Sequence, residues 1–188
     1  MTASRFLLAL LAGALSFTSV PLVHGTTVRY LMPDDLIRGA RRIFHGTCTD
    51  VQSFRDDANR IVTRYTFTVH ETLKGKVDSL QRFTLYGGRY RGLQTVIPGL
   101  SQYRRGDEVV LFLGPVDPGS GLCFPVGLDQ GLFRVTSGEG GKKVSRSLDQ
   151  LHLVAPRTGR PGRFPVRADL DAFKRFVRDR VAAHRKNR

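Results

Sequence analysis

Cysteine is scarce in this chain, and long uncharged stretches are confined to its first residues. The 188 residues include two cysteines, Cys48 and Cys123. After the amino-terminal region, no stretch approaches the roughly 20 apolar residues that a membrane-spanning helix needs. The histidines stand apart, and none belongs to an HExxH or HxH spacing, so the usual zinc-site motifs are missing. The sequence therefore predicts no metal site, no cofactor and no membrane span in the body of the chain.

Motifs of nucleophilic catalysis are missing as well. Ser120 lies between Gly119 and Gly121, but a nucleophile elbow needs Gly-x-Ser-x-Gly between a strand and a helix. Here strands are predicted on both sides of the serine. The lack of paired acid and base groups favours a protein that is not an enzyme.

The first 25 residues have the three parts of a secretory signal peptide. Arg5 stands near the amino terminus, an apolar core runs from Phe6 to Leu15, and a small-residue end follows Pro21. We predict cleavage after Gly25, which would place the protein in the periplasm or outside the cell. An uncleaved membrane anchor is the alternative, although polar residues interrupt the apolar core before it reaches spanning length.

The expected mature chain has the size of one domain. Removing 25 of 188 residues leaves 163, which is enough to bury a real core. In an oxidising compartment an even pair of cysteines is typical of a disulfide. The sequence therefore predicts a Cys48–Cys123 bond, with two unpaired thiols on separate strands as the alternative.

Positive charge gathers at the carboxyl-terminal end. Residues 157–188 hold 11 Lys and Arg against three Asp and Glu, whereas residues 26–156 hold 18 against 13. Such a segment is attracted to anionic surfaces, and salt weakens the attraction. An anionic envelope surface or another envelope protein is the expected partner, although a solvated basic surface without a partner has the same composition. Nucleic acid is not expected, because an exported protein seldom meets it.

A two-residue alternation of apolar and polar side chains indicates short strands. The longest places Tyr65 and Phe67 on one face and Arg64 and Thr66 on the other. Closely spaced strands predict a mainly β domain over residues 26–154, a small antiparallel OB-like barrel of five or six strands. The predicted strands are Ile43–Val51, Ile61–Leu73, Leu80–Tyr86, Val109–Leu113, Leu122–Gly127 and Leu132–Val135.

Helices are expected at both ends of this barrel. A short helix begins at Pro33, with acids in its first turn. A linker rich in Pro, Gly and Arg spans residues 155–167, and a basic amphipathic helix follows within residues 168–188. Asp169 is expected to cap that helix, and Asp171 to pair with Arg175. The width of its apolar stripe favours packing on the barrel, with membrane contact as the alternative. The stripe consists of Leu170, Phe173, Val177 and Val181.

The segment from Gly87 to Arg105 has no periodicity and is expected to be a long surface loop. Glycines allow close approach of the backbone to a ligand, and arginines beside aromatic rings bind anionic or stacked groups. The loop is therefore the candidate ligand surface. Its candidate residues are Arg89, Tyr90, Arg91, Tyr103, Arg104 and Arg105.

Four stretches resemble a group of small exported bacterial proteins without assigned function. They are Leu36–Gly46, which ends in IFHG, Tyr65–Gly75, which reads YTFTVHETLKG, Arg105–Leu113, which reads RGDEVVLFL, and Gly127–Val135, which ends in QGLFRV. More distantly, the order helix, strand, long strand, Lys-Gly turn and strand is similar to the OB-fold barrel of netrin-like domains and tissue inhibitors of metalloproteinases. That resemblance implies the barrel. It does not imply the inhibition, because the inhibitors use an amino-terminal cysteine and this mature chain is expected to begin at Thr26.

Three hypotheses for function remain open. The first is a non-enzymatic exported binding module that uses the loop and the basic tail. The second is an extracytoplasmic hydrolase with a site near His70, Glu71 and the arginines of residues 87–105. General acid and base groups must reach one substrate, so that site requires the side chains to lie close together. The third is a structural envelope protein without a small ligand.

Overall fold

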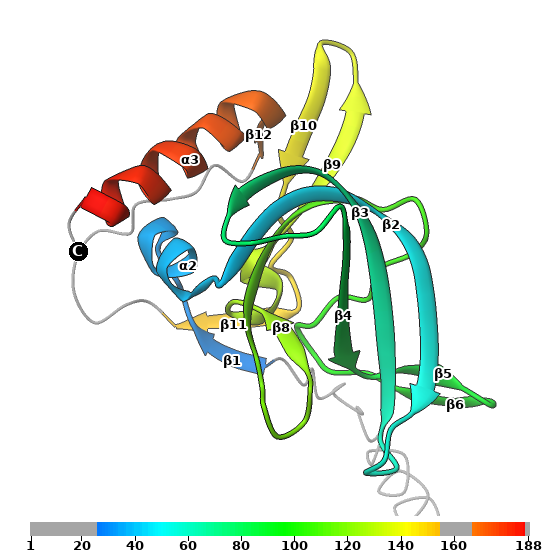
Figure 1. Cartoon of the computed structure of the whole chain (residues 1–188). Helices are drawn as coiled ribbons and strands as arrows, with labels where there is room; N and C mark the ends of the chain where they lie inside the picture. The colour runs from blue at the N-terminus through cyan, green and yellow to red at the C-terminus, as the bar shows by residue number, and fades with distance from the viewer. Residues whose placement is uncertain (1–25, 155–166, 187–188) are drawn as a thin grey trace, which may run out of the picture.

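A computed structural model describes residues 26–154 and 167–186 (Figure 1). The expected signal peptide (residues 1–25) and most of the expected linker (residues 155–166) lie outside the described residues. Within them the chain is mainly β, as the alternation predicts, and each of the six predicted strands is present.

One antiparallel sheet of eight strands forms the body of the protein. Its order is β12–β10–β9–β7–β2–β3–β4, with β8 paired to β7. The bounds are β2 (Arg42–Arg55), β3 (Ile61–Lys74), β4 (Leu80–Tyr86), β7 (Glu108–Val116), β8 (Cys123–Pro125), β9 (Leu132–Gly138), β10 (Gly141–Ser145) and β12 (Arg167–Asp169).

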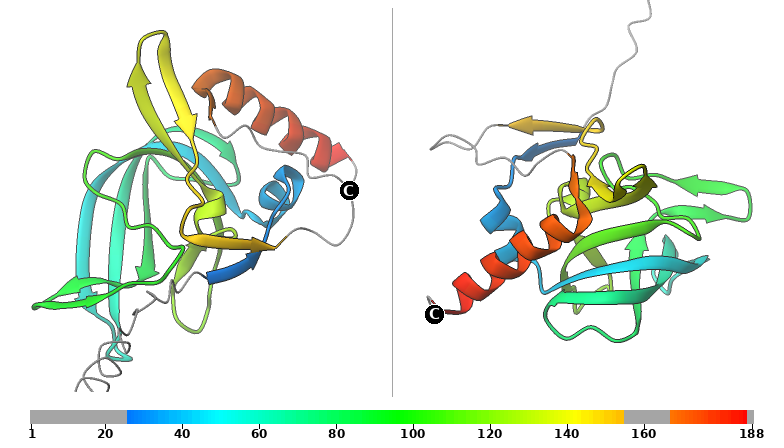
Figure 2. Two further views of the ribbon diagram at one scale, coloured as in Figure 1. Left: turned by 180° about the vertical axis from the view of Figure 1, so that it is seen from behind. Right: turned by 90° about the horizontal axis from the view of Figure 1, so that it is seen from above.

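The sheet curls until its last strand, β4, comes close to β8 (Figures 1 and 2). No strand pairing joins β4 to β8 among the described residues, so backbone hydrogen bonds do not close the sheet into a barrel. The long β2–β3 pair carries shifts in register at Ile43/Phe44, His45/Gly46 and Cys48/Asp50. Such bulges bend strands and increase their twist, which helps this pair to curl.

Two small sheets lie outside the main one. The parallel pair β1 (Thr26–Arg29) and β11 (Leu151–Val154) joins distant parts of the chain. The antiparallel hairpin of β5 (Gly88–Tyr90) and β6 (Leu93–Thr95) occupies the segment that was expected to be a loop. These strands are too short, and too rich in Gly, Arg and Gln, to show a periodicity in the sequence.

A buried glutamine fixes the start of the described chain to the body. Gln130 lies in the 3-10 helix η1 (Leu128–Gly131) and is fully buried. Its side-chain oxygen accepts a hydrogen bond from the Leu31 amide at 2.7 Å, and its side-chain nitrogen donates one to the Arg29 carbonyl at 3.0 Å. The segment that follows β1 is therefore held by side-chain bonds as well as by strand pairing.

The alternation along β3 has the predicted sense. Tyr65 and Phe67 are buried, whereas Arg64 is exposed and Thr66 is partly so. β7 is buried on both faces, as its unbroken apolar run predicts. Successive β7 residues point to opposite faces and join two different hydrophobic clusters. Val109, Leu111 and Leu113 belong to the cluster inside the curl of the sheet, and Val110 and Phe112 belong to the cluster between the other face of the sheet and the helices.

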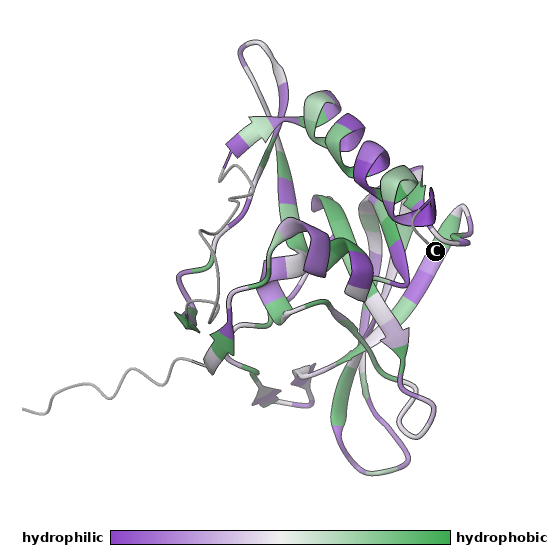
Figure 3. Cartoon of the chain, turned by 90° about the vertical axis from the view of Figure 1, so that its left-hand side faces the viewer, coloured by the Kyte–Doolittle hydropathy of each residue, from purple (hydrophilic) through white to green (hydrophobic). Residues whose placement is uncertain are grey.

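Helices α2 (Pro33–Gly39) and α3 (Leu170–Lys186) cover that second face (Figure 2). Figure 3 shows hydrophobic and hydrophilic bands along α3. The four predicted stripe residues are its buried residues and belong to the same core as the sheet, so packing on the body is confirmed. Neither helix, nor any other within the described ranges, is long and apolar enough to span a membrane.

The ends of α3 follow the predicted capping but not the predicted ion pair. Asp169 accepts a hydrogen bond from the Ala172 amide at 2.9 Å, as expected of an N-cap. Asp171, however, pairs with Lys174 at 2.9 Å and not with Arg175. Lys174 also reaches Glu71 on β3 at 2.9 Å, so one ammonium group joins the helix to the sheet.

The predicted disulfide is wrong: Cys48 and Cys123 are both buried, free thiols. The neighbour of Cys48 in β2, Thr47, pairs with Glu108 at the start of β7, whereas Cys123 pairs with Val116 at its end. The two cysteines therefore lie beside opposite ends of β7, a nine-residue strand with a length of about 25 Å. A disulfide requires the two Cα atoms to lie within about 7 Å of each other, so the bond cannot form in this fold.

Candidate functional site

The outer face of β2, β3 and β4 carries two parallel rows of polar side chains. Residues directly opposite each other in an antiparallel pair share a face, as do residues two apart along one strand. All six side chains in the rows therefore project from the same face. The rows are Asp50–Thr66–Arg82 and Gln52–Arg64–Thr84.

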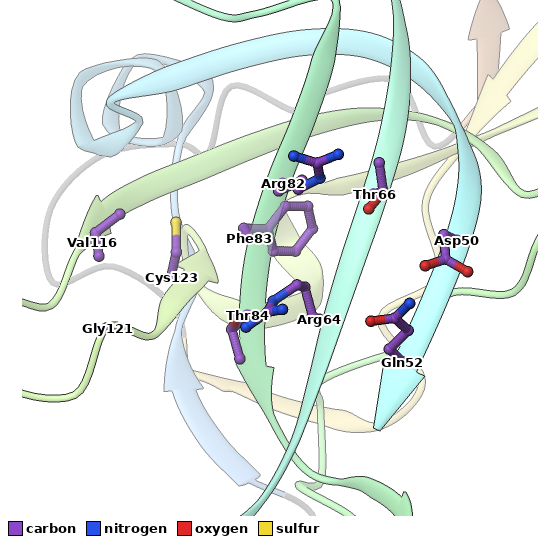
Figure 4. Close-up of a pocket in the computed structure, with 10 residues that line it drawn as sticks. All are labelled: Asp50, Gln52, Arg64, Thr66, Arg82, Phe83, Thr84, Val116, Gly121 and Cys123. Atoms are coloured by element: carbon purple, nitrogen blue, oxygen red, sulfur yellow. The ribbon is translucent and has the colours of Figure 1, made fainter. Parts of the chain in front are cut away.

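These rows line a groove with a volume of about 580 Å³ (Figure 4). Beyond β4, the groove continues to the turn between β7 and β8. Val116, Gly121 and Cys123 line it there, and Phe83, between Arg82 and Thr84 on β4, also contributes to the lining. Figure 4 shows Arg64 and Arg82 between the Asp50 side and the Cys123 side. We call this site the arginine groove.

The arginine groove has an excess of positive charge. Arg105 forms an ion pair with Asp50, the acidic residue of the groove, and so neutralises it. Neither Arg64 nor Arg82 forms an ion pair with a carboxylate in the described ranges. The Arg64 guanidinium lies 5.0 Å from the centre of the Phe54 ring. This cation–π contact orients the side chain but does not neutralise its positive charge.

Such an arrangement is suited to binding an anion. Arg64 and Arg82 occupy diagonal positions on neighbouring strands, where Cα atoms are about 7–8 Å apart, so two guanidinium groups can reach one group. Guanidinium groups bind carboxylates and phosphates through paired N–H donors. The hydroxyl groups of Thr66 and Thr84 offer further donors beside them.

The structure divides the ligand surface that was predicted from the sequence. Arg89, Tyr90 and Arg91 lie on the β5–β6 hairpin. Arg104 is exposed, and Arg105 belongs to the edge of the arginine groove through Asp50.

Tyr103 is not a surface residue, contrary to expectation. It is 2% exposed and packs edge-on against Tyr65 and Phe67 inside the curled sheet. Burial raises the pKa of its hydroxyl well above the ordinary value. An aromatic residue between polar neighbours in an aperiodic segment gives no sequence signal for this inward orientation.

Of the residues in the hydrolase hypothesis, Glu71 and the start of the 87–105 segment are not brought together, whereas the other end of that segment reaches Cys48, next to Thr47, which contacts His70. Glu71 forms ion pairs with Lys174 at 2.9 Å and with Arg178 at 2.8 Å, both on α3. The segment from Gly87 onward begins beside Ile61, at the opposite end of β3. Ten residues of strand, roughly 33 Å along its length, separate Ile61 from Glu71.

A second polar cluster surrounds His45 on β2. Its Nε2 atom lies 2.7 Å from a carboxylate oxygen of Glu108, and its ring centre lies 5.0 Å from that of His70. Lys142 pairs with the same carboxylate at 2.8 Å. Across the described ranges, no group of three His, Cys, Asp or Glu residues is arranged to hold a metal ion.

Burial and hydrogen bonds set the ionisation of this cluster. Burial lowers the pKa of His45 below its ordinary value, although the hydrogen bond to Glu108 acts in the opposite direction. Burial would raise the pKa of Glu108, but the hydrogen bonds from Lys142 and His45 outweigh it and hold that pKa below its ordinary value.

Much of the basic charge of α3 is neutralised within the protein. Besides the pairs of Lys174 and Arg178 with Glu71, Arg180 lies 3.1 Å from the carboxylate of Asp34 on α2. The composition suggested a tail free to contact an anionic surface. In the structure, several of its cations attach the helix to the body instead.

The arginine groove was missed in the sequence, although its β3 residues were correctly assigned to the outward face. Comparison with protein-family models, with curated proteins and with solved structures found no match. The geometry of the described residues is therefore the basis for any proposal about function.

Proposed function

We propose that this protein is an exported, non-enzymatic binding module that holds an anionic group of its ligand in the arginine groove. The observation that carries the proposal is the pair of exposed guanidinium groups, Arg64 and Arg82, which project from the outer face of the sheet into one groove without a carboxylate partner in the described ranges. The anionic group is a carboxylate, a phosphate or a sulfate, the groups that paired arginines bind.

One observation supports the fold in this proposal. The approach of β8 to β4 supports an OB-like barrel whose last seam is not closed by backbone pairing among the described residues. Export rests on the three-part amino-terminal segment of the sequence.

An NMR titration of amide shifts with inorganic phosphate, tripolyphosphate and trigalacturonate tests the groove. We expect the shifts to concentrate at Arg64, Thr66, Arg82 and Thr84. Replacing one arginine removes a charged hydrogen bond, so Arg64→Gln and Arg82→Gln should each weaken binding about tenfold, or about 1.4 kcal/mol.

The matched control is the double variant Arg175→Gln/Arg185→Gln, which removes two exposed charges from α3. The variant to compare it with is Arg64→Gln/Arg82→Gln, which replaces both groove arginines and has the same net charge. The α3 double variant should bind the anions nearly as tightly as the wild type does. Equal losses in the two double variants would mean that net charge alone attracts the anion, and the groove would then have no part in it.

A further inference from the structure

The β5–β6 hairpin projects away from the curled sheet in every view of Figures 1 and 2. At its base, Gly88 has φ +135°, and a Cβ atom there would lie 2.1 Å from the hydroxyl oxygen of Thr63. Glycine is therefore required where the hairpin leaves the body. The hairpin is fixed at that base and free at its tip.

The tip holds an arginine where the backbone favours another residue. Tyr90 pairs with Leu93, so Arg91 and Gly92 form a two-residue turn. Both have positive φ, +47° and +80°, as in a type I′ turn, where Asn-Gly is the preferred sequence. An unfavourable residue in a strained position is a common sign of a functional constraint. The Arg91 guanidinium lies 5.3 Å from the centre of the Tyr90 ring.

The two faces of the hairpin differ in polarity. Tyr90 and Leu93 are cross-strand partners and share one face, whereas Arg89 and Gln94 share the other and are hydrogen-bonded at 3.0 Å. Leu93 is 52% exposed. The tip thus combines one exposed aliphatic side chain, an aromatic ring with a polar end and two cations.

We propose that this hairpin tip docks the protein on an anionic phospholipid surface. Tyrosine rings are favoured at the level of lipid head groups, and aliphatic tips enter the region below it. Arginines keep their charge beside the phosphates while their stems cover apolar surface. The net charge of +14 adds a long-range attraction to anionic lipid. This inference does not rest on the arginine groove, because none of the hairpin residues Arg89–Gln94 lines that groove.

The absence of tryptophan from the chain allows a direct test. In Leu93→Trp, the introduced indole is the sole tryptophan and reports on its own surroundings. With vesicles of mixed phosphatidylglycerol and phosphatidylcholine, its emission should shift to the blue, and brominated acyl chains should quench it. Vesicles of phosphatidylcholine alone should produce little change.

Leu80→Trp and Val154→Trp are the matched controls, because these residues are 49% and 51% exposed at other places on the surface and neither lines the arginine groove. Neither emission should shift or be quenched. Quenching at Leu80 or Val154 without quenching at Leu93 would overturn the hairpin proposal.

Arg91→Asn separates a binding role from a structural one. Asparagine suits the turn better than arginine, so this variant should unfold at a slightly higher temperature. The loss of one cation should nevertheless lower the vesicle partition coefficient about fivefold. Unchanged partitioning of Arg91→Asn and of Leu93→Asp, measured by co-sedimentation with mixed vesicles, would show that the tip does not contact lipid.

Discussion

Among single residues, His45 shows how burial controls ionisation. Its ring is 6% exposed and lies against Glu108. In the unfolded chain it titrates near its ordinary pKa of 6.5, whereas the folded protein lowers that pKa. Between the two values the unfolded chain binds more protons, so stability falls as the pH drops below about 6.5. Glu108, whose pKa is also lowered, adds a further loss in more acidic solution.

We therefore expect the melting temperature to fall from about pH 7.5 to about pH 5.5, and His45→Gln to reduce this dependence. Glutamine can still donate a hydrogen bond to Glu108 but cannot take up a proton. Differential scanning calorimetry at several pH values gives the comparison. His152→Gln, on β11, is the control at an exposed position outside this cluster. If it flattens the dependence as much as His45→Gln does, then His45 is not the group responsible.

The two cysteines allow a second prediction for single residues. Because both are buried and free, thiol reagents should modify neither quickly in the folded protein and both after denaturation without reductant. Burial raises the pKa of Cys48 to about 11, which slows its reaction further. Mass spectrometry after alkylation counts the modified thiols. A melting temperature that falls on addition of reductant would indicate a disulfide instead.

The sequence predicted single residues well where they belong to a periodic strand and poorly elsewhere. Tyr65 and Phe67 were placed correctly because successive side chains of a strand point to opposite faces, so the two-residue period predicts which face each side chain occupies. Tyr103 and the cysteine pair were not, because orientation in an aperiodic loop and distance between strands depend on how the sheet curls. Composition can show that two cysteines exist, but it cannot show that Cys48 on β2 lies beside the start of β7 and Cys123 on β8 beside its end.

At the scale of elements, α3 is tied to the sheet by its apolar stripe and by ion pairs. The centre of the Phe173 ring lies 4.6 Å from the centre of the Phe133 ring on β9. Phe173 as a whole is 2% exposed. Phe173→Ala should lower the free energy of unfolding by about 3–5 kcal/mol, since it removes a buried aromatic side chain and leaves a cavity. Chemical denaturation measures the loss.

Arg175→Ala is the control on the exposed side of the same helix, and should change the free energy of unfolding by less than about 0.5 kcal/mol. Phe173→Leu, which keeps most of the volume, should fall between the two. A Phe173→Ala protein as stable as Arg175→Ala would mean that the helix contributes little to the core.

The sequence predicted the elements with a strong period and missed those without one. α3 was found because its apolar residues repeat at helical spacing over several turns. The β5–β6 hairpin has three residues in each strand, and its turn carries Arg91-Gly92 instead of the usual Asn-Gly. Tertiary contacts at its base, which a sequence pattern does not display, hold it in place.

For the whole molecule, the arginine groove could not be predicted from the sequence alone. Its residues come from five strands, β2, β3, β4, β7 and β8, and from the turn between the last two, and their adjacency depends on register. The outward direction of Arg64 was predictable. Its position diagonal to Arg82 follows from the register in which β3 pairs with β4. The ion pair that neutralises Asp50 depends on Arg105, which lies in a loop far away in the sequence.

The attachment of β1 has a consequence for the order in which the chain acquires its structure. Leu31 bonds to Gln130, 99 residues further along the chain, and β1 pairs with β11, which is later still. β1 is synthesised long before its partners, so it can pair only after nearly all the rest of the described chain has been made. Contacts so distant in sequence form slowly, so we expect this segment to acquire its structure after the hairpins of the main sheet.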